Sequence, residues 1–153
     1  MHFQSIISSN HKLSYGLNTI FYNVNPGSIE PTCKDSTFVT PIYLGIEQGV
    51  EAALYVSDTW DITDKFSTDL GIRYSSFFAM KPFKYYGGPE FRLSGKYLID
   101  DIFTVKAGFN SMMQYIHMLS NTTTASPTDT WKLSDVDIKP QSGWQAAAAL
   151  YAN

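Results

Sequence analysis

The fold is decided by residues 50–78, which read VEAALYVSDTWDITDKFSTDLGIRYSSFF. Apolar and polar side chains alternate along Val50–Ile62 and again along Phe66–Phe78, and alternation over this length is typical of β-strands with two different faces. Only residues 63–65 separate the two runs, so they predict an antiparallel hairpin. In the first strand the apolar face is formed by Val50, Ala52, Leu54, Val56, Trp60 and Ile62.

The same pattern continues on both sides of this hairpin and predicts about seven strands. The other strands are expected at Phe3–Ser8, Leu13–Val24, Pro89–Ile99, Phe103–Met118 and Lys139–Ala152. The connections alternate between short turns and long segments, at residues 9–12, 25–48, 63–65, 79–88, 100–102 and 119–138. Short periplasmic turns alternating with long external loops are typical of outer-membrane barrels. We therefore expect an all-β fold in which residues 1–153 form part of an antiparallel, up-and-down transmembrane β-barrel wall.

Charged residues test this register, because charge is costly on a lipid-facing surface. Eight of the nine charges within the central predicted strands fall on the polar face; the nine are Glu51, Asp58, Asp61, Asp69, Arg73, Glu90, Arg92, Lys96 and Lys106. The exception is Asp58, close to a short turn, where the cost is smaller. Aromatic residues also gather near the short turns, as in a periplasmic girdle or as cross-strand pairs in a soluble sheet. They are Trp60, Phe66, Tyr97 and Phe103.

The composition favours a lipid-facing sheet over several other classes. Aromatic residues make up 15% of the chain and charged residues 16%, against about 25% charged residues in ordinary domains. No apolar run is long enough for a membrane-spanning helix. The net charge of -3 and the scattered Lys and Arg residues give no indication of nucleic-acid binding. The single cysteine, Cys33, excludes an intrachain disulfide.

Two motifs in the central hairpin carry a resemblance to a known family. Tyr55-Val56-Ser57-Asp58-Thr59-Trp60 ends one strand, and Gly71-Ile72-Arg73-Tyr74 lies in the next. This arrangement resembles the barrel domain of TonB-dependent outer-membrane receptors, particularly those of the Bacteroidetes type. The resemblance implies a location in the cell outer membrane and contact with outer-membrane lipid. It also implies a plug domain and the TonB energy-coupling complex as partners in the full-length protein.

The chain lacks several parts of that family's pattern. The resemblance implies a 22-stranded barrel with a plugged lumen. The seven strands expected here would form only part of such a barrel, and the plug domain is absent from this sequence. The N-terminus at Met1–Ser5 has neither a basic region nor an apolar core of a secretory signal. We therefore expect this chain to be an internal fragment of the barrel domain.

No catalytic or metal-binding pattern is found, so the sequence predicts neither an enzyme nor a cofactor. His2, His11 and His117 are far apart and lack the spacing of a metal site. Tyr85 and Tyr86 are expected in one long connection and Trp131 in another, where exposed aromatic rings could stack on a flat ligand or simply pack the loops. These three residues are the candidate ligand-binding residues.

The sequence therefore predicts part of a TonB-dependent transporter that takes up a scarce nutrient. The resemblance leaves the small-molecule or oligosaccharide ligand open among siderophores, cobalamin, oligosaccharides and similar compounds. One alternative is a passive outer-membrane porin or surface barrel, which would have no plug domain. The other is a soluble carbohydrate-binding β-sandwich, whose apolar faces would form a core.

Overall fold

A computed structural model describes residues 1–25, 27–29, 42–43, 45–121 and 128–152. Cys33 lies outside these residues. The described part of the chain forms strands and no helix, with β1 (His2–Ser8), β2 (His11–Val24), β3 (Ser28–Ile29), β4 (Ile42–Tyr43), β5 (Glu47–Thr63), β6 (Phe66–Met80), β7 (Phe83–Leu98), β8 (Phe103–Gln114), β9 (Ile116–Asn121), β10 (Thr128–Leu133) and β11 (Gln141–Ala152). No helix of sufficient length and apolar character to cross a membrane occurs in these described ranges.

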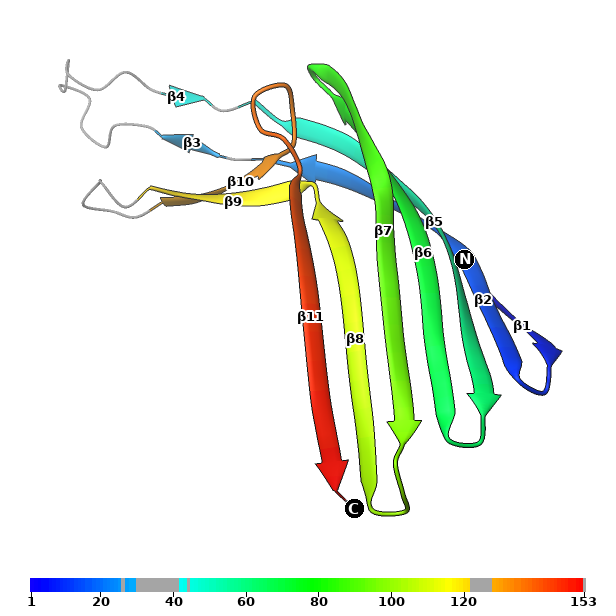
Figure 1. The fold of residues 1–153 in the computed structure, drawn as a ribbon. Helices are drawn as coiled ribbons and strands as arrows, with labels where there is room; N and C mark the ends of the chain where they lie inside the picture. The colour runs from blue at the N-terminus through cyan, green and yellow to red at the C-terminus, as the bar shows by residue number, and fades with distance from the viewer. Residues whose placement is uncertain (26, 30–41, 44, 122–127, 153) are drawn as a thin grey trace.

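Seven strands form one antiparallel sheet in the order β1-β2-β5-β6-β7-β8-β11 (Figure 1). Each strand of this sheet pairs with the next one along the chain, apart from the small hairpins β3–β4 and β9–β10. The predicted all-β, up-and-down sheet of seven strands is confirmed. The sheet is open, however, with β1 and β11 at its two edges, so these residues do not close into a barrel.

In two of the hairpin turns at the lower end of the sheet, the side chain at the start of the turn accepts backbone hydrogen bonds. In the β5–β6 turn, Thr63 Oγ1 accepts hydrogen bonds from the N–H groups of Lys65 and Phe66, at 3.3 and 3.0 Å. In the β7–β8 turn, Asp100 Oδ1 accepts from the N–H groups of Ile102 and Phe103, at 2.9 and 2.7 Å. Short polar side chains favour tight turns by this mechanism. The register on either side is therefore fixed locally.

The predicted long connection between β6 and β7 is wrong. The two strands continue past their predicted ends and meet at a turn of only Lys81 and Pro82. Aromatic residues explain the extension, because Phe78 faces Tyr85 across the strands with ring centroids 5.0 Å apart. Aromatic cross-strand pairs stabilise a sheet and outweigh the glycines at 87 and 88. The resulting hairpin projects past the upper end of the sheet (Figure 1).

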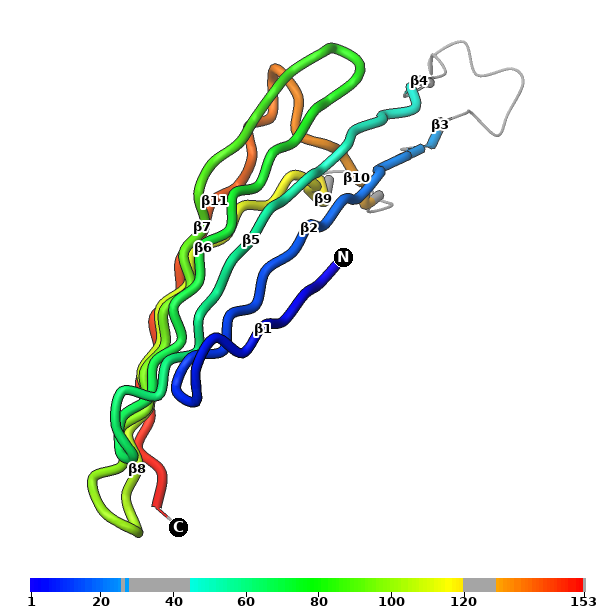
Figure 2. Tube along the Cα trace, turned by 90° about the vertical axis from the view of Figure 1, so that its right-hand side faces the viewer, coloured from blue at the N-terminus to red at the C-terminus, as the bar shows by residue number. Residues whose placement is uncertain are grey.

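The last long connection also contains regular structure. Strand β8 ends at Gln114, and after Tyr115 the chain enters the hairpin β9–β10, in which Trp131 pairs with Met118. This hairpin crosses toward β5 and β2 instead of continuing the sheet (Figure 1). Figure 2 shows the curved profile of the main sheet, with the β6–β7 hairpin at its upper end.

The only buried hydrophobic cluster in the described part of the chain lies where β9–β10 packs on the sheet. Phe77, Ala79, Tyr115 and Leu133 form its centre, with Phe77 and Tyr115 stacked at a centroid distance of 5.0 Å. Phe77 belongs to the face of β6 that also carries Arg73 and Ser75, since side chains alternate between the faces of a strand. The small core therefore lies on the polar face, and the opposite face is left uncovered.

Candidate functional site

The apolar face is a continuous surface across the main sheet. Cross-strand rows place Val56 opposite Ile72 and Ile72 opposite Phe91, and the next row joins Leu70 to Leu93. All of these side chains are exposed, as are other large residues of the same face, including Tyr15, Leu17, Leu54, Tyr74, Trp144 and Leu150. An exposed apolar surface of this extent indicates contact with a membrane or with another protein.

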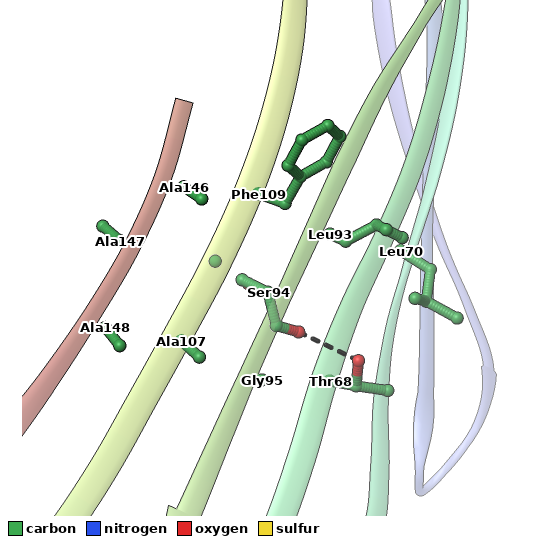
Figure 3. A pocket seen from close by; sticks show the side chains of 11 residues that line it. Thr68, Leu70, Leu93, Ser94, Gly95, Ala107, Phe109, Ala146, Ala147 and Ala148 are labelled. Atoms are coloured by element: carbon green, nitrogen blue, oxygen red, sulfur yellow. Dashed lines mark hydrogen bonds between the residues drawn. The ribbon is translucent and has the colours of Figure 1, made fainter. Parts of the chain in front are cut away.

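A shallow depression of about 670 Å³ lies in this face over β7, β8 and β11 (Figure 3). Small residues form its floor, among them Gly95, Ala107 and Ala148, while Leu93 and Phe109 stand beside it. Within it, the Thr68 hydroxyl donates to the backbone oxygen of Ser94 at 2.9 Å. The other side chains named here are apolar, so the depression suits apolar groups.

Aromatic side chains line the lower edge of the apolar face, as the sequence predicts. Phe66 and Tyr97 are cross-strand partners with ring centroids 6.3 Å apart. The ring of Trp60 stacks on His11 at 5.1 Å. Farther up, Tyr15, Tyr74 and Trp144 lie on the same face and are exposed. Aromatic residues thus gather at the lower edge of the apolar surface and also occur within it.

Asp58 is the one charged residue of the nine on the apolar face, and the structure gives it a partner. Its Oδ2 lies 2.8 Å from His11 Nδ1 on the neighbouring strand. Both side chains are about one third exposed, and the Oδ1 of Asp58 is buried with no hydrogen-bond partner. The exception in the charge pattern is therefore a cross-strand pair beside Trp60.

The polar face carries a charged cluster centred on Arg73. The guanidinium of Arg73 lies 2.9 Å from a carboxylate oxygen of Glu51 and 3.9 Å from one of Glu90, so the arginine stands between two carboxylates from the neighbouring strands. Glu51 is only 8% exposed. Glu90 is largely covered as well. Carboxylates in this position need such a cation, because an unpaired charge there is costly.

Hydroxyl groups complete the cluster. The fully buried Ser75 donates to Glu90 at 2.6 Å, and its hydroxyl also lies 2.8 Å from that of Tyr115. On the other side, Tyr22 donates to Glu51 at 2.7 Å. The network joins strands β2, β5, β6 and β7 to the residue that precedes β9. Through Tyr115 it adjoins the buried cluster where the hairpin β9–β10 packs.

A second set of charges fastens the β9–β10 hairpin to the start of β5, also on the polar face. Lys132 Nζ lies 2.7 Å from Glu47 and 2.9 Å from Asp135, and the other oxygen of Glu47 accepts from the Leu133 N–H at 2.8 Å. The Tyr86 hydroxyl donates to the backbone oxygen of Asp135 at 2.6 Å. The hairpin is thus anchored to β5 and β7 at once.

The environment shifts the pKa of Lys132 in β10 and of Asp135, which follows this strand. Burial acts to lower the pKa of Lys132, but its hydrogen bonds with Glu47 and Asp135 raise it overall above the ordinary value. Burial acts to raise the pKa of Asp135, but hydrogen bonds from Lys132 and from the backbone of Ile138 and Asp137 lower it overall. Both shifts favour the charged pair.

The structure does not bring the three candidate ligand-binding residues together. Tyr85 and Tyr86 lie within β7 and point to opposite faces, as neighbouring strand residues do. Tyr85 packs on Phe78 on the apolar face, whereas Tyr86 packs against the buried cluster on the polar face. Trp131 lies in β10 and is 49% exposed. A shared role in stacking on a ligand stays a prediction.

The anchoring residues were not singled out from the sequence. Glu47 and Lys132 are 85 residues apart, and no local pattern connects them. Arg73, Glu51 and Glu90 could be assigned to one face, but only the strand register shows that Arg73 directly faces Glu90. Each histidine has a hydrogen-bond partner of its own: His2 is paired with Tyr55, His11 with Asp58 and His117 with Ser134.

No group of three or more His, Cys, Asp or Glu side chains suited to a metal ion occurs among the residues that the structure describes.

The main sheet presents two different faces. One face is apolar and exposed. The other is charged, its ion pairs are internal, and the anchored β9–β10 hairpin covers part of it. Comparison with protein-family models, with curated proteins and with solved structures finds no match to this chain.

Proposed function

We propose that this chain is part of the wall of an outer-membrane β-barrel, with its apolar face against lipid and its polar face toward the lumen. The observation that carries the proposal is the exposed apolar face, which runs across the main sheet with Asp58 as its one charge in the central strands and His11 as its partner. A membrane strand alternates between lipid-facing and lumen-facing residues in this way.

The height of the apolar face supports a membrane location. In β6 and β7 the part of the surface from the row Phe66–Tyr97 to the row Tyr74–Pro89 is nine residues long on each strand, and exposed apolar residues of the β6–β7 hairpin continue the same face above it. At about 3.3 Å per residue this is about 26 Å along the strand. With a tilt of about 40° the height is about 20 Å, close to the apolar band of known barrels, which is about 25 Å tall.

The open edges support a partial barrel. Strands β1 and β11 pair on one side only within the described residues, so each presents free N–H and C=O groups. Such groups cost several kcal/mol each in lipid, and closed barrels are the only sheets that avoid this. Further strands, from the same protein, would therefore complete the wall.

We further propose that the complete protein is a TonB-dependent transporter for a scarce nutrient such as a siderophore, cobalamin or an oligosaccharide. The resemblance of residues 51–74 to that family supports this assignment. The plug domain and the energy-coupling complex would undergo the conformational change of transport. The residues of this chain would form part of the barrel wall and its loops. The proposal assigns no catalytic step to this chain.

The two alternatives make different predictions. A passive porin has no plug domain and admits solutes without the TonB complex. A soluble carbohydrate-binding sandwich needs a second sheet over the apolar face. In the described part of the chain, the hairpins lie away from that face, and the buried cluster is on the other side.

Uptake measurements in cells that make the full-length protein test the proposal. We expect the protein in the outer-membrane fraction, and uptake of its nutrient that stops when the TonB complex is deleted. Uptake that persists without TonB would favour the porin. Recovery of the protein in the soluble fraction would overturn the membrane assignment altogether.

A further inference from the structure

Two lysines face each other on the polar side of the sheet, near its lower end. Lys96 of β7 and Lys106 of β8 are direct cross-strand partners, and both are exposed. Side chains of like charge in this position destabilise a sheet. Neither lysine forms an ion pair within the residues that the structure describes. Asp69, diagonal to Lys96 on β6, accepts instead from the Thr59 hydroxyl at 3.3 Å.

Higher on the same face, a cation is paired with carboxylates from both of its neighbouring strands. Arg73 of β6 lies between Glu51 of β5 and Glu90 of β7. Lys106 has no such neighbours, because its partner on β7 is the other lysine and its partner on β11 is Ala149. Strand β11 contains no charged residue at all. A carboxylate for Lys106 must therefore come from beyond β11 or from outside the sheet.

The ammonium group of Lys106 reaches over the edge strand. Its Nζ lies 4.8 Å from the ring centroid of Tyr151, a distance at which an aromatic ring attracts a cation. Strand β11 is an edge of the sheet within the described residues (Figure 1). The polar-face residues before Tyr151 are Ala147 and Ala149, whose methyl groups leave the way from the ammonium group to the free edge open. A long side chain on a strand paired with β11 can therefore reach Lys106.

We propose that the strand that pairs with the free edge of β11 carries an Asp or Glu beside Ala149 on the polar face, and that this carboxylate binds Lys106. Neighbouring strands are about 4.8 Å apart, so this strand lies about 10 Å from β8, a distance that a lysine and a carboxylate side chain span together. The position of the ammonium group over Tyr151 favours a partner on the next strand over one in the lumen. The inference rests on the barrel wall proposed above, because only a wall that continues past β11 provides this strand.

Carbodiimide cross-linking of the full-length protein in outer-membrane vesicles tests the inference. The reagent joins a lysine amine to a carboxylate in contact with it, and mass spectrometry of the digested protein identifies both residues. We expect Lys106 to be joined to an Asp or Glu of the strand that follows β11. Lys106→Arg keeps the positive charge but cannot react, so this product should be lost. Lys132, which lies 2.7 Å from Glu47, is the control and should give its own product in both proteins.

A charge exchange then tests whether the pair stabilises the wall. Lys106→Glu should lower the melting temperature of the full-length protein, and replacing the cross-linked carboxylate with Lys in the same protein should restore most of the loss. The matched control is Lys96→Glu, which places a carboxylate directly opposite Lys106 and should not lower the melting temperature.

The outcomes separate this inference from the proposed function. A Lys106 product with a carboxylate elsewhere in the protein, or no Lys106 product while Lys132 reacts, would overturn the inference and leave the outer-membrane assignment standing. A charge exchange that fails to restore the melting temperature would also overturn it. Recovery of the protein in the soluble fraction would overturn both.

Discussion

The two faces of the main sheet come from the same strands, yet one is apolar and exposed and the other carries the charges and the buried cluster. Along β7, Phe91 and Leu93 lie on the exposed apolar face, whereas the residues between and beyond them, Arg92 and Ser94, lie on the polar face. In a soluble protein the apolar face would be the core. Here the buried residues gather on the polar face instead. This difference agrees with the proposal that the apolar face contacts lipid.

The polar face shows how such a sheet is held together without a core between layers. Ion pairs and hydroxyls around Arg73 connect four strands. Beside them, Leu133 of the β9–β10 hairpin packs on Phe77 and Tyr115 in a small buried cluster. Backbone pairing supplies the remaining cohesion. If the account is correct, changes on the two faces should have different effects in lipid, and the following substitutions measure that difference.

The largest effect is expected from placing a charge in the middle of the apolar face. Leu93→Arg should lower the free energy of unfolding in lipid vesicles by about 2–4 kcal/mol, because the arginine would lie near the bilayer midplane. The matched control is Ser94→Arg, one residue away on the polar face and opposite Asp69. We expect this control to change stability by less than about 0.5 kcal/mol in urea titrations. Equal losses would remove the distinction between the faces.

The next effect concerns the charged cluster. Arg73→Met should destabilise the full-length protein by about 1–3 kcal/mol, because Glu51 and Glu90 would lose their cation while still largely buried. Arg92→Met, on the same face of the next strand and exposed, serves as the control. Denaturant unfolding compares the two. Similar values for both variants would show that the cluster contributes nothing beyond surface charge.

A smaller effect is expected at the anchor of the β9–β10 hairpin, and it depends on pH. The pKa of Asp135 is lowered from its ordinary 3.8, so its contribution is present above that pH and is lost as the pH falls below it. The pKa of Lys132 is raised from its ordinary 10.5, so its contribution is present below that pH and is lost as the pH rises beyond the raised pKa. The hairpin should therefore be most firmly held between about pH 4 and pH 10.

Hydrogen exchange of β9–β10 checks this expectation. Glu47→Gln should reduce protection of the hairpin by up to about 1 kcal/mol at neutral pH, since the ion pair is partly exposed. Asp129→Asn, an exposed carboxylate on the same hairpin, should leave protection unchanged. A hairpin that is equally protected in both variants and at all pH values would not depend on this anchor.

The smallest effect, and one of opposite sign, is expected at the charge pair of the apolar face. Replacing both partners, as in His11→Leu/Asp58→Leu, should be neutral or stabilising by up to about 1 kcal/mol in lipid, because the pair no longer has to be desolvated. Asp58→Leu alone leaves the histidine without its partner and is the comparison. A loss of several kcal/mol in the free energy of unfolding of the double variant would mean that the His11–Asp58 pair itself stabilises the sheet.

Much of the main sheet could be predicted from the sequence, because its signal is local. Alternation along β5 and β6, with a short turn between them, fixes both the pairing and the face of each residue. Eight of the nine charges in the central strands follow the same register, and the exception, Asp58, is paired with His11 in the structure. These features depend on side-chain order alone.

The upper end of the sheet could not be predicted in the same way. Lys81-Pro82 and Gly87-Gly88 are typical of loops, but the aromatic pairs between β6 and β7 outweigh them. The fold of β9–β10 onto the sheet depends on contacts such as Lys132 with Glu47, which are far apart in the chain. The separation of Tyr85 from Tyr86 follows only once both are known to lie in a strand.

Brominated lipids offer the most direct measurement of the central claim. In the full-length protein with its natural tryptophans replaced by Phe, single tryptophans are placed in turn at Phe91, Arg92, Leu93 and Ser94. Bromine on the acyl chains quenches the fluorescence of tryptophans that touch lipid. We expect strong quenching at positions 91 and 93 and little at 92 and 94. Equal quenching at all four positions, or none at any, would contradict the assignment of the apolar face to lipid.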